Sequence, residues 1–366
     1  MIPVAEPCIG KKEREYVLDC IESGWVSSSG KYILKFEKGF SEYCDTKYGI
    51  SCSNGTTALH LALLALGIGK GDEVIVPTLT FIATANAVTY TGARPVFVDS
   101  DSITWNIDPR KIEEKITTKT KAIIPVHLYG NPCNMDEIMD IAGKYGLYVI
   151  EDAAEAHGAK YKGRMVGSIG NMGCFSFYGN KIITTGEGGM ITTNEEESAD
   201  KIAMLRDHAM SKDRKYWHDF IGYNYRMTNL QAALGLAQLE NIDNIIEIKR
   251  KNARIYSFLL RDVKGITFPR EESRDKNVYW MYSVLIEDDY GITRDALMKK
   301  LSTEGIDSRP FFYPIHIMPP YRDVGDFPVA EVLSKKGINL PSSAKLNRTE
   351  IEKICKVIQK NESFTG

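Results

Sequence analysis

Short apolar runs alternate with helix-like segments between residues 74 and 150, and this alternation limits the folds that the chain can adopt. The runs are β-branched or apolar throughout, and they cover residues 74–76, 96–98, 122–126 and 147–150. Helical spacing of apolar residues marks the segments between them, 82–90, 110–116 and 135–145. Buried strands that alternate with helices predict a parallel sheet covered by helices on both faces. We therefore expect an α/β fold.

Polar side chains stand where several of these strands end. Asp99 and His127 follow two of the apolar runs, and Asp152 follows a third. Ligands of open parallel sheets bind beyond the carboxyl ends of the strands. We expect these side chains to face a shared crevice.

The stretch from residue 147 to residue 193 contains a pair of residues with a specific chemical use. Asp152 comes after the run 147–150, and Lys181 comes shortly after a second apolar run at 174–178. A carboxylate that keeps a pyridinium nitrogen protonated and a lysine that forms a Schiff base are what a pyridoxal-phosphate enzyme needs. A surface lysine and a helix N-cap are the plainer interpretations. We hypothesise that Asp152 and Lys181 belong to one cofactor site.

A turn that suits a phosphate precedes a buried helix. Residues 54–57 read Asn-Gly-Thr-Thr, and the apolar segment ALHLALLAL follows at 58–66. Free backbone N–H groups and the helix dipole favour an anion there, although a plain N-cap has the same composition. The hydroxyls of Thr56 and Ser176 can donate to such a phosphate, and Phe81 can stack on a planar ring or lie in the core.

Composition and missing motifs exclude several classes of protein. The formal net charge is -2, and no apolar stretch is long enough for a bilayer, so we expect neither a nucleic-acid nor a membrane partner. Seven cysteines without a CxxC pair predict a cytoplasmic protein without a metal site or disulfide framework. The absence of GxGxxG and GxxxxGK[ST] argues against a dinucleotide dehydrogenase and a P-loop enzyme.

The length of 366 residues favours a large domain and a smaller one. Helical periodicity continues from residue 229 to about residue 262, and we place the boundary within this helix. Residues 1–243 are predicted to form the large cofactor-binding domain. Residues 244–366 are predicted to form a smaller α+β domain, which includes a loop rich in proline and aromatic residues at 309–321.

These residues together resemble those of the DegT/DnrJ/EryC1/StrS family of pyridoxal-phosphate sugar aminotransferases. The resemblance covers essentially the full length of the chain. The motifs that carry it are SNGTTALHLAL at 53–63, GDEVIVP at 71–77, PVHLYG at 125–130, VIEDAAEAHGA at 149–159, FSFYGNKIITTGEGGMI at 175–191 and GYNYRMTNLQAA at 222–233.

The resemblance implies the aspartate aminotransferase (type I) fold and a homodimer with shared active sites. Lys181 would be the Schiff-base lysine and Asp152 the pyridinium partner. Glu155 stands where many relatives have a glutamine that binds the phenolic oxygen of the cofactor, and this departure leaves its role open. The remaining implied cofactor contacts are Gly55, Thr56 and Ser176 with the phosphate, Phe81 with the ring, and Asn224 with the phosphate from the partner subunit.

The resemblance also implies the reaction. L-glutamate would give its amino group to pyridoxal 5'-phosphate, and the resulting pyridoxamine 5'-phosphate would aminate a nucleotide-linked 4-keto-6-deoxyhexose. Segments 180–194, 216–229 and 308–321 are most similar to members that act on a GDP-linked 4-keto-6-deoxy sugar. A UDP- or dTDP-linked keto sugar and a non-catalytic regulator are the alternatives. Expected substrate contacts are His127, Tyr129, Arg309, Tyr313 and His316.

Overall fold

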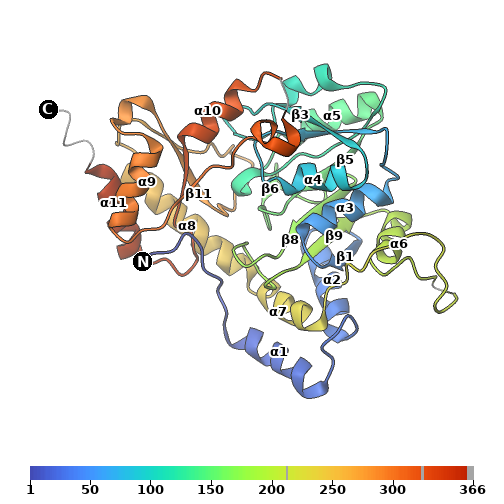
Figure 1. The fold of residues 1–366 in the computed structure, drawn as a ribbon. Coiled ribbons are helices and arrows are strands. Elements are labelled where there is room, and N and C mark those ends of the chain that lie inside the picture. Colours follow the sequence, from blue (N-terminus) through green and yellow to red (C-terminus); the bar gives the residue numbers. More distant parts are fainter. Residues whose placement is uncertain (212, 323–324, 361–366) are drawn as a thin grey trace.

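A central sheet of seven strands organises the computed structural model, which describes residues 1–211, 213–322 and 325–360 (Figure 1). The strand order is β1-β9-β8-β5-β4-β2-β3. The strands are β1 (Tyr48–Cys52), β2 (Glu73–Pro77), β3 (Arg94–Val98), β4 (Thr120–Ile123), β5 (Tyr148–Asp152), β8 (Met172–Ser176) and β9 (Gly189–Thr193). All neighbours are parallel except β9, which is antiparallel to both β1 and β8. The expected α/β fold with a mostly parallel sheet is confirmed.

Helices cover both faces of this sheet, as its apolar strands require. All five residues of β2 and of β9 are buried. The helices are α1 (Lys11–Ser23), α2 (Lys31–Tyr43), α3 (Gly55–Ala65), α4 (Ala83–Tyr90), α5 (Met135–Tyr145), α6 (Glu196–Leu205) and α7 (Asn229–Leu239). On one face, Phe40 of α2 packs edge-to-face against Phe175 of β8 and against Phe177, with centroid distances of 4.9 and 5.2 Å. A two-stranded ribbon, β6 (Lys160–Tyr161) with β7 (Arg164–Met165), lies between β5 and β8 in the sequence.

The antiparallel strand β9 gives the region around Lys181 its form. Because β9 returns directly beside β8, with Cys174 opposite Ile191, no crossover helix separates the two strands. Residues 177–188 form the whole connection, and a bridge between Tyr178 and Gly186 closes its base. Lys181 therefore lies on a short loop at the carboxyl end of β8.

A second, smaller sheet follows in the sequence. It is antiparallel, in the order β10 (Ile266–Thr267), β11 (Tyr282–Ile286), β13 (Gly337–Leu340) and β12 (Arg309–Pro310). The helices of this part are α8 (Ile242–Leu260), α9 (Arg294–Thr303), α10 (Pro328–Lys336) and α11 (Arg348–Gln359). The start of the chain also reaches this part, since Ile2 bridges to Ile306, shortly after the end of α9. The boundary near residue 243, in the first turn of α8, stays a prediction.

Two helix predictions were wrong in detail. The helix expected from residue 229 onward is broken into α7 and α8, because Asn241 leaves the helical region with φ −119° and ψ 6°. Residues 110–116 form two short 3₁₀ turns, Pro109–Lys111 and Glu113–Lys115. So few residues gain too few hydrogen bonds to offset the cost of starting an α-helix.

Among the described residues, no helix combines the length and apolar character needed to cross a bilayer.

Candidate active site

Asp152 ends β5 with its carboxylate buried and only lightly bonded. One oxygen accepts a hydrogen bond from Thr84 Oγ1 on α4 at 2.8 Å, and the other accepts one from the N–H of Ala154 at 3.2 Å. Burial raises the pKa of Asp152, and these two hydrogen bonds and the charge of Lys181 oppose the rise. The carboxylate therefore retains acceptor capacity for a further donor, which a positively charged partner would supply.

Lys181 extends from its loop into the space between two acidic side chains and an indole. Its Nζ lies 3.8 Å from Glu155 Oε1 and 4.0 Å from the centroid of the Trp280 ring. Only 12% of the side chain is exposed. Burial lowers the pKa of Lys181, while Glu155 and Asp152 act in the opposite direction. A lowered pKa provides more of the neutral, nucleophilic amine at physiological pH.

Glu155, the residue whose role the sequence left open, is held in place by an unusual backbone. Its Oε2 accepts a hydrogen bond from the N–H of Tyr129 at 2.7 Å, and Tyr129 has a left-handed φ of 54°. The Tyr129 hydroxyl in turn accepts the N–H of Phe312 at 3.0 Å. Burial raises the pKa of Glu155 to about 7, although Lys181 opposes this rise. Glu155 can therefore act as a donor or as an acceptor near neutral pH.

The start of α3 meets the end of β8 in a small cradle. Asn54 caps the helix by accepting the N–H of Thr57 at 2.9 Å. A Cβ at Gly55 would lie only 2.7 Å from the Cβ of Ser176, so only glycine allows this close approach. The structure thus brings Gly55 and Ser176 together, with Thr56 in the same first turn of the helix. Backbone N–H groups at a helix start beside a hydroxyl suit a phosphate.

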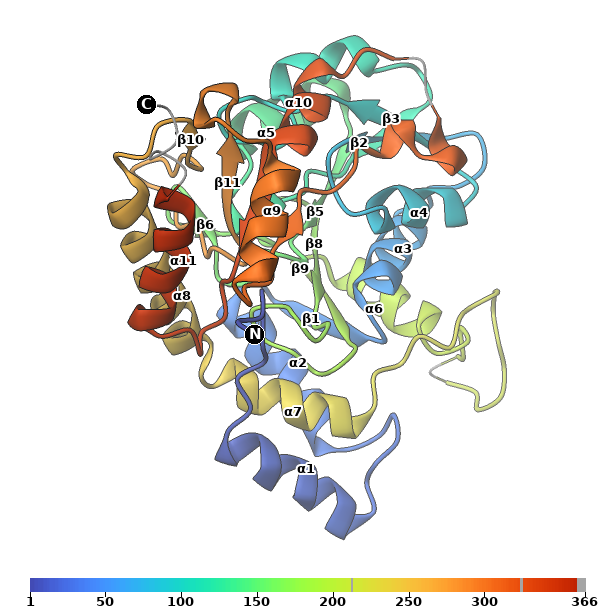
Figure 2. The same ribbon diagram turned by 60° about the vertical axis from the view of Figure 1, so that its left-hand side comes forward.

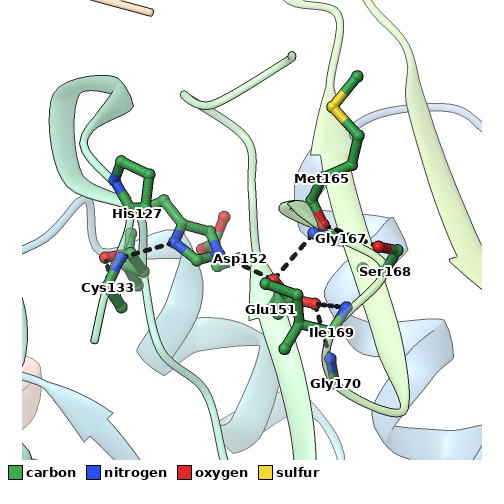
Figure 3. A network of polar contacts seen from close by, with 12 residues as sticks. His127, Cys133, Glu151, Asp152, Met165, Gly167, Ser168, Ile169 and Gly170 are labelled. Carbon is green, nitrogen blue, oxygen red and sulfur yellow. Dashed lines mark hydrogen bonds and ion pairs between the residues drawn. The ribbon is translucent and has the colours of Figure 1, made fainter. Parts of the chain in front are cut away.

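His127 does not face the crevice, contrary to our expectation that it contacts substrate. Its Nδ1 accepts the N–H of Cys133 at 3.0 Å, so its Nε2 carries the proton and donates to Glu151 at 3.1 Å (Figure 3). The side chain is completely buried. Both ring nitrogens are therefore occupied within the protein, and the histidine supports the loop after β4.

His316 is likewise buried, whereas the other predicted substrate contacts from its loop are exposed. The two ring nitrogens of His316 lie 2.7 Å from Thr78 Oγ1 and 3.2 Å from the Glu331 carboxylate. Arg309 and Tyr313 are open to solvent, and 60% of Tyr313 is exposed. His316 therefore attaches the 309–321 loop to the end of β2, and Arg309 and Tyr313 are the members of this set that a substrate can reach.

Phe81 and Asn224 are both exposed on the surface of the monomer. Phe81 is 57% exposed, and its ring centroid lies 5.9 Å from that of Phe312. Asn224 lies in the connection between α6 and α7, which extends away from the body of the protein (Figure 2). The carbonyl of the next residue, Tyr225, accepts the N–H of Ser53 at 2.8 Å, so the end of this connection lies beside the turn that precedes α3.

Trp280 is the site residue that sequence reasoning missed. It is 5% exposed, lies just before β11, and donates from Nε1 to the carbonyl of Asn180 at 2.7 Å. In the sequence it belongs to the run VYWMY at 278–282, which has the composition of an ordinary buried strand. Only the three-dimensional arrangement places it against Lys181.

Comparison with known proteins gives the class. The DegT/DnrJ/EryC1/StrS aminotransferase family matches residues 7–359. The GDP-perosamine synthase of Caulobacter vibrioides is 51% identical over 356 residues, which cover 96% of each chain. That of Escherichia coli O157:H7 is 50% identical over 366 residues, which cover 100% of this chain and 99% of the relative. The crystal structure of S. venezuelae DesV, in complex with a ketimine intermediate, has a TM-score of 0.90 at 35% identity and covers 95% of this chain and 93% of that one.

The chain belongs to the DegT/DnrJ/EryC1/StrS aminotransferase family. It is a pyridoxal-phosphate-dependent sugar aminotransferase. The local chemistry fits this cofactor, because a lightly bonded buried carboxylate, a buried amine and a phosphate-ready cradle occur together at the carboxyl ends of β5 and β8. Within the described ranges, no three His, Cys, Asp or Glu side chains gather as metal ligands.

Proposed function

We propose that the protein transfers the amino group of L-glutamate to GDP-4-keto-6-deoxymannose, which yields GDP-perosamine for polysaccharide synthesis. Two relatives that are 50 and 51% identical over nearly the whole chain carry the name GDP-perosamine synthase. The observation that carries the chemistry is the amine of Lys181, which lies 3.8 Å from Glu155 and is shielded from solvent. The free cysteines, all seven of them, support a cytoplasmic location.

The residues of the site divide the work of holding the cofactor. Asp152 would keep the pyridine nitrogen protonated, and Glu155 would face the phenolic oxygen. The first turn of α3 and Ser176 would hold the phosphate, while Phe81 would cover the ring. When bound, pyridoxal phosphate supplies an electron sink for charge that develops at the substrate carbon.

Lys181 would carry the proton in both halves of the reaction. In the first half its neutral amine would accept the proton from the α-carbon of glutamate, and the resulting ammonium would deliver a proton to C4′ of the cofactor. In the second half the amine would take a proton from that C4′, and the ammonium would deliver a proton to C4 of the sugar. One side chain thus serves as base and acid, and such groups contribute about 10²- to 10⁴-fold to the rate. Its buried position keeps bulk water from exchanging this proton.

A second copy of the chain would complete the site. The α6–α7 connection that carries Asn224 also exposes apolar side chains, with 76% of Tyr216 and 86% of Ile221 accessible in the monomer. Exposed apolar groups on an extended loop favour a covered interface. We expect a homodimer in sedimentation experiments, and Asn224→Ala should weaken binding of the cofactor. A monomeric protein with unchanged cofactor affinity in Asn224→Ala would contradict the shared site.

Two experiments test the function. Borohydride reduction of the cofactor-loaded protein should attach the cofactor to the peptide containing Lys181, and Lys181→Ala should abolish turnover. A panel of GDP-, UDP- and dTDP-linked 4-keto sugars with glutamate should give an amino sugar only from the GDP sugar, as identified by product mass. Amination of a UDP or dTDP sugar instead would reject the GDP assignment. A protein that binds the cofactor without turning over any panel member would be a regulator.

A further inference from the structure

One side chain of the second sheet touches both the peptide and the amine of the reactive lysine. Trp280 precedes β11, yet its Nε1 donates to the carbonyl of Asn180, the residue before Lys181, at 2.7 Å. The face of the same indole lies 4.0 Å from Lys181 Nζ. The indole therefore restrains the backbone at the base of the lysine and also faces the end of its side chain.

The charges around this amine favour its ammonium form, which the indole face can stabilise. Glu155 Oε1 lies 3.8 Å from Nζ, and Asp152 also attracts the ammonium electrostatically. Burial lowers the pKa of nearby His157 to about 3, so it brings no charge to the site at neutral pH. An ammonium at this buried position loses most of its hydration, and the negative face of an indole is one of the few apolar surfaces that stabilise a cation.

We propose that Trp280 is a positioning residue for Lys181, and that it holds the lysine ammonium in the interval when the amine is not bonded to the cofactor. The inference rests on the proposed role of Lys181. The Trp280–Asn180 hydrogen bond fixes the loop, and the ring face receives the charged amine.

The proton transfers show when this contact is needed. As Lys181 accepts the α-proton, the C–H bond breaks, its electron pair remains with the carbon and the cofactor, and a new N–H bond turns the amine into an ammonium. The charge appears at Nζ, where the indole face lies. The ammonium would then lose a proton to C4′ of the cofactor and become neutral. In the second half the amine would gain a proton from that C4′ and give one to the sugar carbon. Trp280 thus stabilises the ammonium that exists in each half between the proton it accepts and the proton it donates.

A buried aromatic residue can also be a simple core residue, and Phe311 provides the matched control. Phe311 is 1% exposed and packs against Tyr129 and Trp105, with centroid distances of 4.7 and 5.3 Å. Tyr129 also stacks on Trp280 at 6.3 Å, so both residues belong to one aromatic group. Phe311→Leu should reproduce any general loosening of that group without removing the indole from Lys181.

The first test uses the cofactor-free protein, the state in which the amine is free. Trace labelling with acetic anhydride across a pH series, read on the Lys181 peptide by mass spectrometry, gives the pH of half-maximal labelling. We expect this midpoint to fall by about 0.5 to 1 pH unit in Trp280→Met and by less in Trp280→Phe, which keeps a weaker ring face. Phe311→Leu should keep the wild-type midpoint. An unchanged or raised midpoint in Trp280→Met would overturn the proposal.

The second test follows the proton directly. In single turnovers with glutamate deuterated at the α-carbon, Trp280→Met should slow proton transfer about tenfold and enlarge the isotope effect, with little change in the glutamate concentration for half-saturation. Equal rates in Trp280→Met and Phe311→Leu would overturn the proposal. Failure of the underlying function looks different, because Lys181 would then escape borohydride trapping and Lys181→Ala would remain active.

Discussion

Glu151 and Asp152 are neighbours on β5, but their carboxylates have opposite surroundings. Successive side chains of a strand point to opposite sides, so the two acids face different regions. Glu151 accepts the N–H groups of Gly167, Ile169 and Gly170 at 2.7 to 2.8 Å, and it also faces His127 (Figure 3). Asp152 accepts one hydrogen bond from Thr84 and one from the backbone.

The difference separates a carboxylate that supports the fold from one that we propose serves the reaction. A carboxylate has about four acceptor sites, and four donors surround Glu151. Its bonds attach the loop before β8 and the loop after β4 to the strand between them. Asp152 has unused acceptor capacity and a raised pKa, which is the condition of a group that awaits a charged partner. The number of hydrogen bonds, and not the type of residue, distinguishes the two roles.

The largest expected effect comes from Asp152→Asn. An amide cannot hold the cofactor nitrogen protonated, so we expect turnover to fall by about 1,000-fold or more, which corresponds to about 4 kcal/mol in the barrier. The cofactor-free protein should keep its free energy of unfolding, because the substitution removes a buried charge, the amide oxygen can still accept the N–H of Ala154, and the amide N–H can donate to Thr84 Oγ1. Steady-state kinetics and urea unfolding measure both values. A clear loss of stability in Asp152→Asn would show that Asp152, like Glu151, supports the fold.

Glu151→Gln should show the opposite pattern. The amide group would turn an N–H toward backbone donors and leave at least one buried N–H without an acceptor. We expect the free energy of unfolding to fall by about 3 kcal/mol, measured by urea denaturation. The turnover number per folded, cofactor-loaded subunit should stay within a few-fold of wild type. If kcat fell as far as in Asp152→Asn, both carboxylates would serve the reaction.

Glu155→Gln tests the third acid through pH. The pKa of Glu155 is about 7 in the folded protein, raised by burial from 4.5. The folded state therefore binds more protons than the unfolded state between about pH 4.5 and pH 7, and the contribution of Glu155 to stability is lost as the pH rises through this range. In the cofactor-free protein, the free energy of unfolding should change less with pH in Glu155→Gln than in the wild type, by about 2 kcal/mol over this range. Urea unfolding at several pH values measures this difference. An unaltered pH dependence would mean that Glu155 titrates normally.

The smallest effect is expected from His127→Asn. The shorter amide can still accept the N–H of Cys133 but cannot reach Glu151, whose other donors remain. We expect a loss of about 1 kcal/mol in the free energy of unfolding. Because His127 is buried away from the crevice, KM for the sugar nucleotide should not change, as initial-rate measurements would detect. A large rise in KM would restore the substrate contact that the sequence suggested.

Much of this arrangement could be predicted from local sequence. Asp152 and Lys181 each follow an apolar run, and parallel strands bring such ends to one edge of the sheet. The turn before α3 is visible as a capping sequence. These inferences need only local pattern and one rule about sheets. The role of each of these residues in the reaction stays a prediction until the substitutions are made.

The parts that could not be predicted depend on contacts between distant segments. His127 and His316 have polar, loop-like sequence surroundings, but their burial follows from partners on other elements, Glu151 and Thr78. Trp280 lies in an apolar run whose periodicity is that of any buried strand. The break between α7 and α8 depends on the backbone of Asn241, in a segment whose side-chain pattern continues without interruption. Contacts between distant segments, and backbone changes of this kind, cannot be predicted from the local sequence pattern.

The Trp280–Asn180 hydrogen bond also bears on the order in which the parts of the chain fold during synthesis. It joins residues 100 positions apart, and the Thr84–Asp152 bond joins residues 68 apart. The β8–β9 hairpin that carries Lys181 can form as soon as it leaves the ribosome, since its contacts are local. Its lysine gains the indole only after residue 280 has been translated and the second sheet has begun to form. A nascent chain therefore displays the lysine early but completes its surroundings late, after the second sheet has formed.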